Sequence, residues 1–429
     1  MSAWRAGTGR VWASRRGAPA VACMLTALAL LLSCGGDGNR DRTGAETTIR
    51  FWQFWDVGVI EPIVRRFEAD NPGVHVKVEQ LTWKSGLEKI QAAMASGTQP
   101  DLCELGSTWL PRFRYEGVLE DLTGVYEAEA DSFILWDSAR WNGRVYGLPW
   151  VQGSRALFYN RDLFRRAGLD PERPPRTWNE LLDAARRINA LGNRIYGFGQ
   201  NLGERYVLYK KFMAFAWGNG GRILDDDGRV AFGDEPVVQA LDFYVKLGAY
   251  SLQEKQEVLD NYFKSGRLGM QISGAWNLRN YREEVPDLDY GVALVPRPTR
   301  THGTPASFAG AEMLVVFRGT HHRDVTVGLA RYLQSYDSAR RLSLAVGSVF
   351  PAERRVASDS AFTSDPRVRA FVDQSMTSRT APAHPGWIEM EDVINRAVEE
   401  ALYGRRAPRW CVESATKELE AIVDRYKTR

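Results

Sequence analysis

The segment from residue 48 to residue 105 alternates strand-like and helix-like apolar patterns, and this alternation restricts the fold more than any other sequence feature. Strand-like runs at 48–52, 74–78 and 102–105 enclose helical stripes at 60–67 and 87–94. Proline and glycine follow both helical stripes and end them. Strand, helix, strand, helix, strand is the order of a parallel sheet with right-handed crossovers. The sequence therefore predicts an α/β fold.

A second series of strand and helix patterns begins near residue 155. It predicts strands at 156–159, 196–199, 268–272, 290–295 and 312–317. It predicts helices at 177–191, where Thr177 opens a capping box, at 204–216, at 235–250 and from about 365 onward. Single hydrophobic cores stop growing at roughly 250–300 residues. Since the chain has 429 residues, we expect two domains.

The N-terminal segment predicts export and a lipid anchor. Four arginines and no acid precede an apolar run at 18–32, which is the pattern of a signal peptide over residues 1–33. The run ends Leu-Leu-Ser-Cys34 and resembles the bacterial lipobox, in which the cysteine is lipidated. A polar tether follows over residues 34–45. We expect an extracytoplasmic protein in the periplasm or at the cell surface, with its N-terminal lipid as the only membrane contact.

Several classes of function are disfavoured by charge and by missing motifs. The formal net charge is +3, and loss of the signal peptide arginines leaves −1, which disfavours nucleic acid as a partner. The sequence has no phosphate-binding loop, no dinucleotide fingerprint, no nucleophile elbow and no zinc-ligand spacing. We therefore expect no cofactor, no metal and no catalytic residue. Cys103 and Cys411 could form a disulfide, but their surroundings favour two separate buried thiols.

Tryptophans follow the first three predicted strands, at the positions where a ligand would bind. The chain has fourteen tryptophans, and Trp55, Trp83 and Trp109 come directly after these strands. The carboxyl ends of parallel strands line the ligand crevice of an open sheet. Indole faces stack on the apolar faces of sugar rings, so we expect a carbohydrate ligand. The tryptophans expected to pack in the core are Trp136, Trp141, Trp178 and Trp410.

Seven stretches, in shared order over some 210 residues, carry a family resemblance. They read FEADNPG from Phe67, QPDL from Gln99, GVLEDL from Gly117, YGLPW from Tyr146, LFYN from Leu157, TWNEL from Thr177 and FKSGRLGM from Phe263, the last leading to SGAW. With these stretches the chain resembles the extracellular solute-binding proteins of carbohydrate-uptake ABC transporters, the group that includes maltose-binding protein.

The resemblance implies a two-lobe periplasmic-binding-protein fold with a hinge and a central ligand cleft. It places the N-terminal lobe at 46–151 and 306–348 and the C-terminal lobe at 152–305 and 349–429. Strands near 150–155 and 295–307 are expected to cross between the lobes. The implied protein is a monomer that delivers its solute to membrane permease subunits, which work with a separate cytoplasmic ATPase.

The resemblance also places stacking aromatic residues on Trp109, Trp276 and Trp387, and a ligand-contacting loop on the stretch that ends at Glu312. Polar neighbours of the tryptophans complete the expected site. The residues expected to bind the ligand are Trp55, Asp56, Gln80, Trp83, Trp109, Trp150, Gln152, Trp276, Asn277, Gly310, Glu312 and Trp387.

Three other functions stay open at this point. The solute could be a polyamine, a choline-like cation or a peptide, because the same fold serves many ligands and aromatic boxes also bind cations. A secreted carbohydrate-active enzyme could use two carboxylates in an aromatic cleft. A sensor could present its ligand state to a receptor. The sequence does not distinguish one sugar from another.

Overall fold

The computed structural model describes residues 46–125, 127–204 and 206–427. The expected signal peptide, the tether and the lipidation site Cys34 lie outside the described residues. The chain from Ala45 onward forms one compact unit. Within the described ranges, no helix combines the length and the apolar character that a membrane span needs.

The described chain alternates strands and helices throughout. The strands are β1 (Thr47–Gln53), β2 (Val74–Gln80), β3 (Leu102–Gly106), β4 (Arg140–Trp141), β5 (Arg144–Val145), β6 (Leu148–Asn160), β7 (Tyr196–Asn201), β8 (Ser251–Glu254), β9 (Leu268–Gly274), β10 (Tyr290–Ala293), β11 (Ala309–Val316) and β12 (Phe350–Pro351). The α-helices are α1 (Val57–Asp70), α2 (Gly86–Ser96), α3 (Leu110–Tyr115), α4 (Arg161–Arg166), α5 (Trp178–Asn189), α6 (Leu208–Gly218), α7 (Glu235–Gly248), α8 (Gln256–Lys264), α9 (Trp276–Glu284), α10 (Arg323–Gln334), α11 (Tyr336–Val346), α12 (Ser360–Thr363), α13 (Pro366–Thr377), α14 (Trp387–Leu402) and α15 (Pro408–Lys427). Short 3-10 helices cover Glu127–Ser132, Trp136–Ala139 and Arg354–Ser358.

The first three strands form the parallel sheet that the sequence predicts. β1 pairs in parallel with both β2 and β3. Its alternate residues Ile49 and Phe51 are fully buried, as expected for a strand rich in β-branched and aromatic side chains. Asp56 caps α1, because its carboxylate accepts a hydrogen bond from the N–H of Gly58. Gly97 ends α2 with a φ of 70°, a left-handed conformation that favours glycine. The predicted alternation is confirmed.

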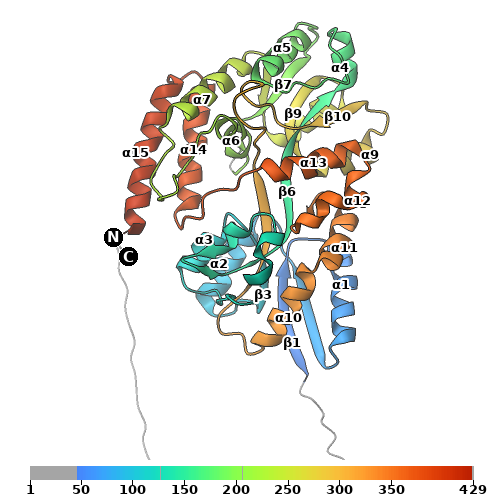
Figure 1. The fold of residues 1–429 in the computed structure, drawn as a ribbon, viewed down its shortest axis with the longest axis vertical. Helices are drawn as coiled ribbons and strands as arrows, with labels where there is room; N and C mark the ends of the chain where they lie inside the picture. The colour runs from blue at the N-terminus through green and yellow to red at the C-terminus, as the bar shows by residue number, and fades with distance from the viewer. Residues whose placement is uncertain (1–45, 126, 205, 428–429) are drawn as a thin grey trace, which may run out of the picture. The chain divides into compact units, whose positions relative to one another are not determined.

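The long strand β6 belongs to two groups of strands, as Figure 1 shows. Its first half pairs antiparallel with β11, which in turn pairs with β3. Its second half pairs antiparallel with β9 and β10, and β9 pairs with β7. The strand order is β2-β1-β3-β11-β6-β9-β7-β8. One continuous strand of thirteen residues therefore links the β1–β3 sheet to the β7–β9 sheet.

Several sequence predictions need correction. The strand expected near 150–155 is confirmed as part of β6, but the one expected at 295–307 is wrong. That segment contributes only an isolated bridge from Arg297 to Thr177, and the regular strand β11 begins at Ala309. Trp410 was expected in the core, yet it is 45% exposed at the start of α15. The two separate buried thiols are confirmed, because Cys103 and Cys411 are both buried and free.

Gly197 in β7 allows that strand to pack directly against α5. A Cβ atom at this position would lie 2.0 Å from the carbonyl oxygen of Ala185 in α5. Backbone cannot move aside cheaply, so we expect Gly197→Ala to lower the free energy of unfolding by about 2 kcal/mol, measured by urea denaturation. Gly328→Ala in α10 is the matched control, since a Cβ atom there meets nothing within 4 Å. It should leave stability unchanged or raise it by up to about 1 kcal/mol. A Gly197→Ala protein as stable as the parent contradicts this packing.

Candidate functional site

Aromatic side chains that follow the first three strands meet at one edge of the sheet. Phe54 follows β1, Trp83 follows β2 and Trp109 follows β3. The rings of Phe54 and Trp83 stack with centroids 4.1 Å apart, and Trp109 tilts against both at 5.9 and 5.5 Å. Trp83 remains 47% exposed. We call these three residues the aromatic cluster, and it leaves a large apolar face available to a ligand.

Buried polar atoms without a hydrogen-bond partner lie on the strands beside the aromatic cluster. Within the described chain, these atoms include Gln53 Nε2, Glu104 Oε1, Gln152 Oε1 and Nε2, and Glu312 Oε2. They come from β1, β3, β6 and β11, which are neighbours in the sheet. Leaving one such group unsatisfied costs about 1–3 kcal/mol. A ligand with several hydroxyl groups, each both donor and acceptor, would satisfy these amides and carboxyls.

The carboxyl groups of Glu104 and Glu312 both hold a proton more tightly than usual. Burial and the negative charge of Glu312 raise the pKa of Glu104 well above its usual range, although the N–H of Phe54 donates a 2.8 Å hydrogen bond to it. Burial raises the pKa of Glu312 to about 7, against the attraction of Lys210 and Arg155. A Cβ atom at Gly106 would lie 3.7 Å from Glu312 Oε2 and 3.9 Å from Trp109 Cδ2. The Glu312 carboxyl and the Trp109 indole therefore both lie beside Gly106.

Positively charged side chains and a second set of aromatic rings lie across from Glu312. The guanidinium of Arg155 in β6 lies 4.9 Å from the ring centroid of Trp276 and 5.7 Å from that of Phe308. The ammonium of Lys210 in α6 lies 5.1 Å from the Phe308 centroid. The Trp276 ring occupies the space over Gly274. A Cβ atom added to Gly274 would lie only 1.8 Å from this ring. Glycine at 274 therefore fixes where this half-buried indole can lie.

The structure brings some of the expected site residues together and places others elsewhere. Trp83, Trp109 and Glu312 lie together as described above. Gln152 and Gly310 lie on the paired strands β6 and β11, where Gly310 faces Gly153. Trp55 is half-buried directly after β1.

Five other expected residues are engaged in the fold itself or lie at its surface. Trp150 and Trp387 are each only 1% exposed, packed against Phe51 and Tyr209 respectively. Asn277 is fully buried and donates hydrogen bonds to Asp260 and Ser273. Gln80 is exposed at the end of β2, and Asp56 is exposed where it caps α1. Ligand contact by these five residues stays a prediction.

Sequence reasoning missed four polar residues of this region. Gln53 and Glu104 lie in strands that read as apolar, Arg155 interrupts the apolar run of β6, and Lys210 begins the buried helix α6. Lys, Glu and Arg are almost never buried unless they are paired. A charged residue inside an apolar strand was therefore the signal that could have found Glu104 and Arg155.

Glu312 gives the fold a specific pH dependence. Because its pKa is about 7 in the folded chain, against 4.5 for an ordinary glutamate side chain, the folded state holds this proton more tightly. Its contribution to stability is full below pH 4.5 and is lost as the pH rises through 7. In the parent, the free energy of unfolding should fall as the pH rises from 4.5 to 7. In Glu312→Gln this fall should be smaller by on the order of 2 kcal/mol, measured by urea denaturation. Parallel pH profiles for parent and variant contradict a raised pKa at Glu312.

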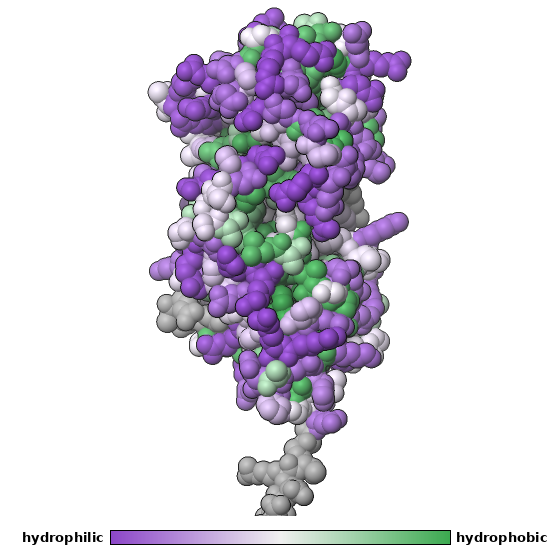
Figure 2. Space-filling view, turned by 90° about the vertical axis from the view of Figure 1, so that its right-hand side faces the viewer, coloured by the Kyte–Doolittle hydropathy of each residue, from purple (hydrophilic) through white to green (hydrophobic). Residues whose placement is uncertain are grey.

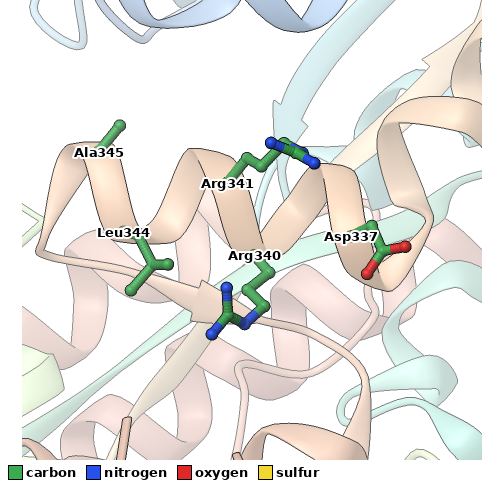
Figure 3. Close-up of a pocket in the computed structure, with 5 residues that line it drawn as sticks. All are labelled: Asp337, Arg340, Arg341, Leu344 and Ala345. Atoms are coloured by element: carbon green, nitrogen blue, oxygen red, sulfur yellow. The ribbon is translucent and has the colours of Figure 1, made fainter. Parts of the chain in front are cut away.

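Surface hollows on α11 are separate from the aromatic cluster. Figure 3 shows one of about 460 Å³ whose lining residues all come from α11, with Arg340 and Leu344 turned to one side of the helix. Arg340 donates a hydrogen bond to Asp359, so its guanidinium is already engaged. A second hollow of about 400 Å³ includes Leu344 and Phe362, on a face where Figure 2 shows apolar side chains gathered between polar ends. Neither hollow is lined by the residues of the candidate site.

Comparisons with known proteins match most of the chain. A family model of bacterial extracellular solute-binding proteins matches residues 57–340. A binding protein of Brucella abortus is 28% identical over 375 residues, which cover 85% of this chain and 89% of that protein. An ABC transporter solute-binding protein from Thermotoga lettingae, bound with alpha-D-tagatose, superposes with a TM-score of 0.74 at 28% identity, covering 88% of this chain and 100% of that chain. The sugar-binding protein MalE of Xanthomonas citri superposes with a TM-score of 0.79 at 26% identity, covering 89% of this chain and 98% of that chain. The chain has the two-lobe α/β fold of these binding proteins.

Proposed function

Because the chain belongs to the family of bacterial extracellular solute-binding proteins, we propose that it is the solute-binding component of an ABC importer and that its ligand is a sugar or an oligosaccharide. Two of its structural relatives are a tagatose-bound protein and the sugar-binding protein MalE. The observation that carries the proposal is the row of unsatisfied buried polar atoms next to the aromatic cluster. Stacking faces with adjacent donors and acceptors match a sugar ring and its hydroxyl groups.

The proposed lobes are residues 46–151 with 306–348, and 152–305 with 349–429. Two buried apolar clusters support this division. One takes its members from residues 49–151 and 311–342, with Ala352 as the one exception. The largest takes its members from residues 157–295 and 381–423, apart from Ala306 and Phe308 at the boundary. Glu312 and the aromatic cluster then belong to the first lobe, and Arg155, Lys210 and Trp276 to the second. A ligand touching both sets favours the closed arrangement, since it gains the contacts of both lobes only when they approach.

The proposed role is capture without catalysis. In this account the closed, ligand-bound chain is the form that membrane permease subunits accept, and a separate ATPase on the cytoplasmic side drives import. Lipid attached to Cys34 would hold the chain at the extracytoplasmic face of the membrane, and the chain would act as a monomer. The carboxyl pair Glu104 and Glu312 serves as a hydrogen-bonding group.

Intrinsic tryptophan fluorescence tests the proposed function. The purified chain from Gly35 onward is titrated with mono-, di- and oligosaccharides, and with spermidine and choline as controls. We expect a saturable change in tryptophan fluorescence with at least one saccharide. We also expect this saccharide to be recovered intact afterwards. A response to spermidine or choline alone contradicts a sugar ligand. A saccharide recovered in cleaved form contradicts capture without catalysis.

A further inference from the structure

Two positively charged groups of the candidate site have no carboxylate partner. The Arg155 guanidinium and the Lys210 ammonium lie over the same ring, that of Phe308, at 5.7 and 5.1 Å. Arg155 makes one long hydrogen bond, 3.5 Å from Nη1 to the carbonyl oxygen of Ser154. Among the residues that the structure describes, no carboxylate oxygen pairs with either group within 4.0 Å, although many other arginines and lysines form such ion pairs. Both side chains are only partly exposed.

Glu312, the carboxyl group whose charge acts on both members of this pair, balances it only in part. Arg155 keeps its proton at neutral pH, because burial lowers its pKa only to about 10. Lys210 also stays mostly protonated, since burial lowers its pKa to about 8 while the attraction of Glu391 and Glu312 opposes the shift. Glu312, with a pKa of about 7, is only about half ionised at pH 7. Burial and the negative charge of Glu312 raise the pKa of Glu104 well above its usual range.

We propose that Arg155 and Lys210 form a subsite for an anionic substituent of the ligand, so that the preferred solute is an acidic saccharide carrying a carboxylate or a phosphate monoester. The proposal rests on the proposed function and narrows its ligand class. A guanidinium offers two parallel N–H donors to such a group, and an ammonium adds a point charge. Hydroxyl groups alone would accept these hydrogen bonds but would leave the charge of the half-buried pair without a counter-ion.

The surrounding aromatic rings support an anion at this position. Trp276 and Phe308 flank the guanidinium, and Tyr209 and Phe308 flank the ammonium. Cation–π contacts hold both side chains in place and exclude water from one side of each charge. Charge interactions strengthen where water is excluded. An acidic saccharide would therefore stack its ring on an indole and direct its anion toward the pair.

Calorimetric titration with matched ligands tests the subsite. The probes are D-glucose, D-glucuronate and D-glucose 6-phosphate, and the corresponding three forms of D-galactose. We expect at least one anionic form to bind tenfold or more tightly than its neutral parent, with an advantage that shrinks between 20 and 500 mM NaCl. The anionic form that binds more tightly, the uronate or the phosphate, shows which of the two groups the subsite prefers.

Variants assign the preference to this pair. Lys210→Met should reduce the ratio of neutral to anionic dissociation constants at least fivefold, and Lys210→Arg should retain it. Lys246→Met is the matched control, because Lys246 is exposed on α7 and its loss changes the net charge equally. Equal affinity for neutral and anionic forms overturns the subsite and leaves the proposed function standing. A ratio that Lys210→Met does not change also overturns it, and no binding of any saccharide overturns both.

Discussion

Trp276→Ala is expected to weaken saccharide binding on the order of 100-fold, about 2.7 kcal/mol. The indole is a half-buried flat apolar surface, and the Arg155 guanidinium lies over it at 4.9 Å from its centroid. Removing it takes away the stacking face and also releases the guanidinium from one of the two rings that hold it. Titration calorimetry measures the loss directly, with the saccharide that responds best in the fluorescence screen.

Trp410→Ala is the matched control for this loss. Trp410 is 45% exposed at the start of α15, where Arg406 lies over its ring, and it takes no part in the candidate site. Its replacement removes one indole and should leave affinity within about twofold, as expected for a surface position away from the interface. Similar dissociation constants for the Trp276→Ala protein and its parent would show that the ligand does not use this ring.

Gly274→Ala is expected to weaken binding by roughly 10- to 100-fold without removing any ligand contact. The added Cβ atom would lie 1.8 Å from the Trp276 ring, so the indole has to leave its place over β9. The ring would then no longer present the same face, and its contact with Arg155 would be lost. The experiment separates the position of the indole from its presence.

A double-mutant cycle provides the control. In a Trp276→Ala background the ring is absent, so Gly274→Ala should cost little further affinity. Urea denaturation of each variant checks that the fold persists. If Gly274→Ala binds as tightly as the parent, or if its cost is the same with and without the indole, the packing of Trp276 over Gly274 does not set the affinity.

Local sequence patterns were sufficient for the first three strands and the two helices between them. The strands β1, β2 and β3 and the helices between them depend on apolar periodicity and on glycine and proline breaks, which neighbouring residues determine. Their parallel pairing follows from the crossover rule. The expected strand at 295–307 is absent and the short strands β8 and β12 were not predicted. Pairing with a distant strand such as β6 decides whether such segments become strands, and the sequence does not show it.

The sequence predicted where the aromatic residues of the candidate site gather, but it did not predict most of the polar residues of the site. Tryptophans after successive parallel strands indicated where Trp83 and Trp109 gather, because chain order alone places those loops at one edge of the sheet. Burial, by contrast, is a tertiary property. Trp150 and Trp387 proved buried, and Glu104 and Arg155 proved to be ionisable residues within apolar strands. The spacing of residues along the chain could not show which polar atoms remain unsatisfied after folding.

Isothermal titration calorimetry of the purified chain with its responding saccharide is the most direct test of the account. We expect heats that saturate at one ligand per chain and return to the baseline after each injection. Capture without catalysis produces no further heat once the site is full. A sustained heat flow after saturation would reveal turnover, and the absence of binding heat with every saccharide would reveal a different solute; either result contradicts a sugar-capturing protein.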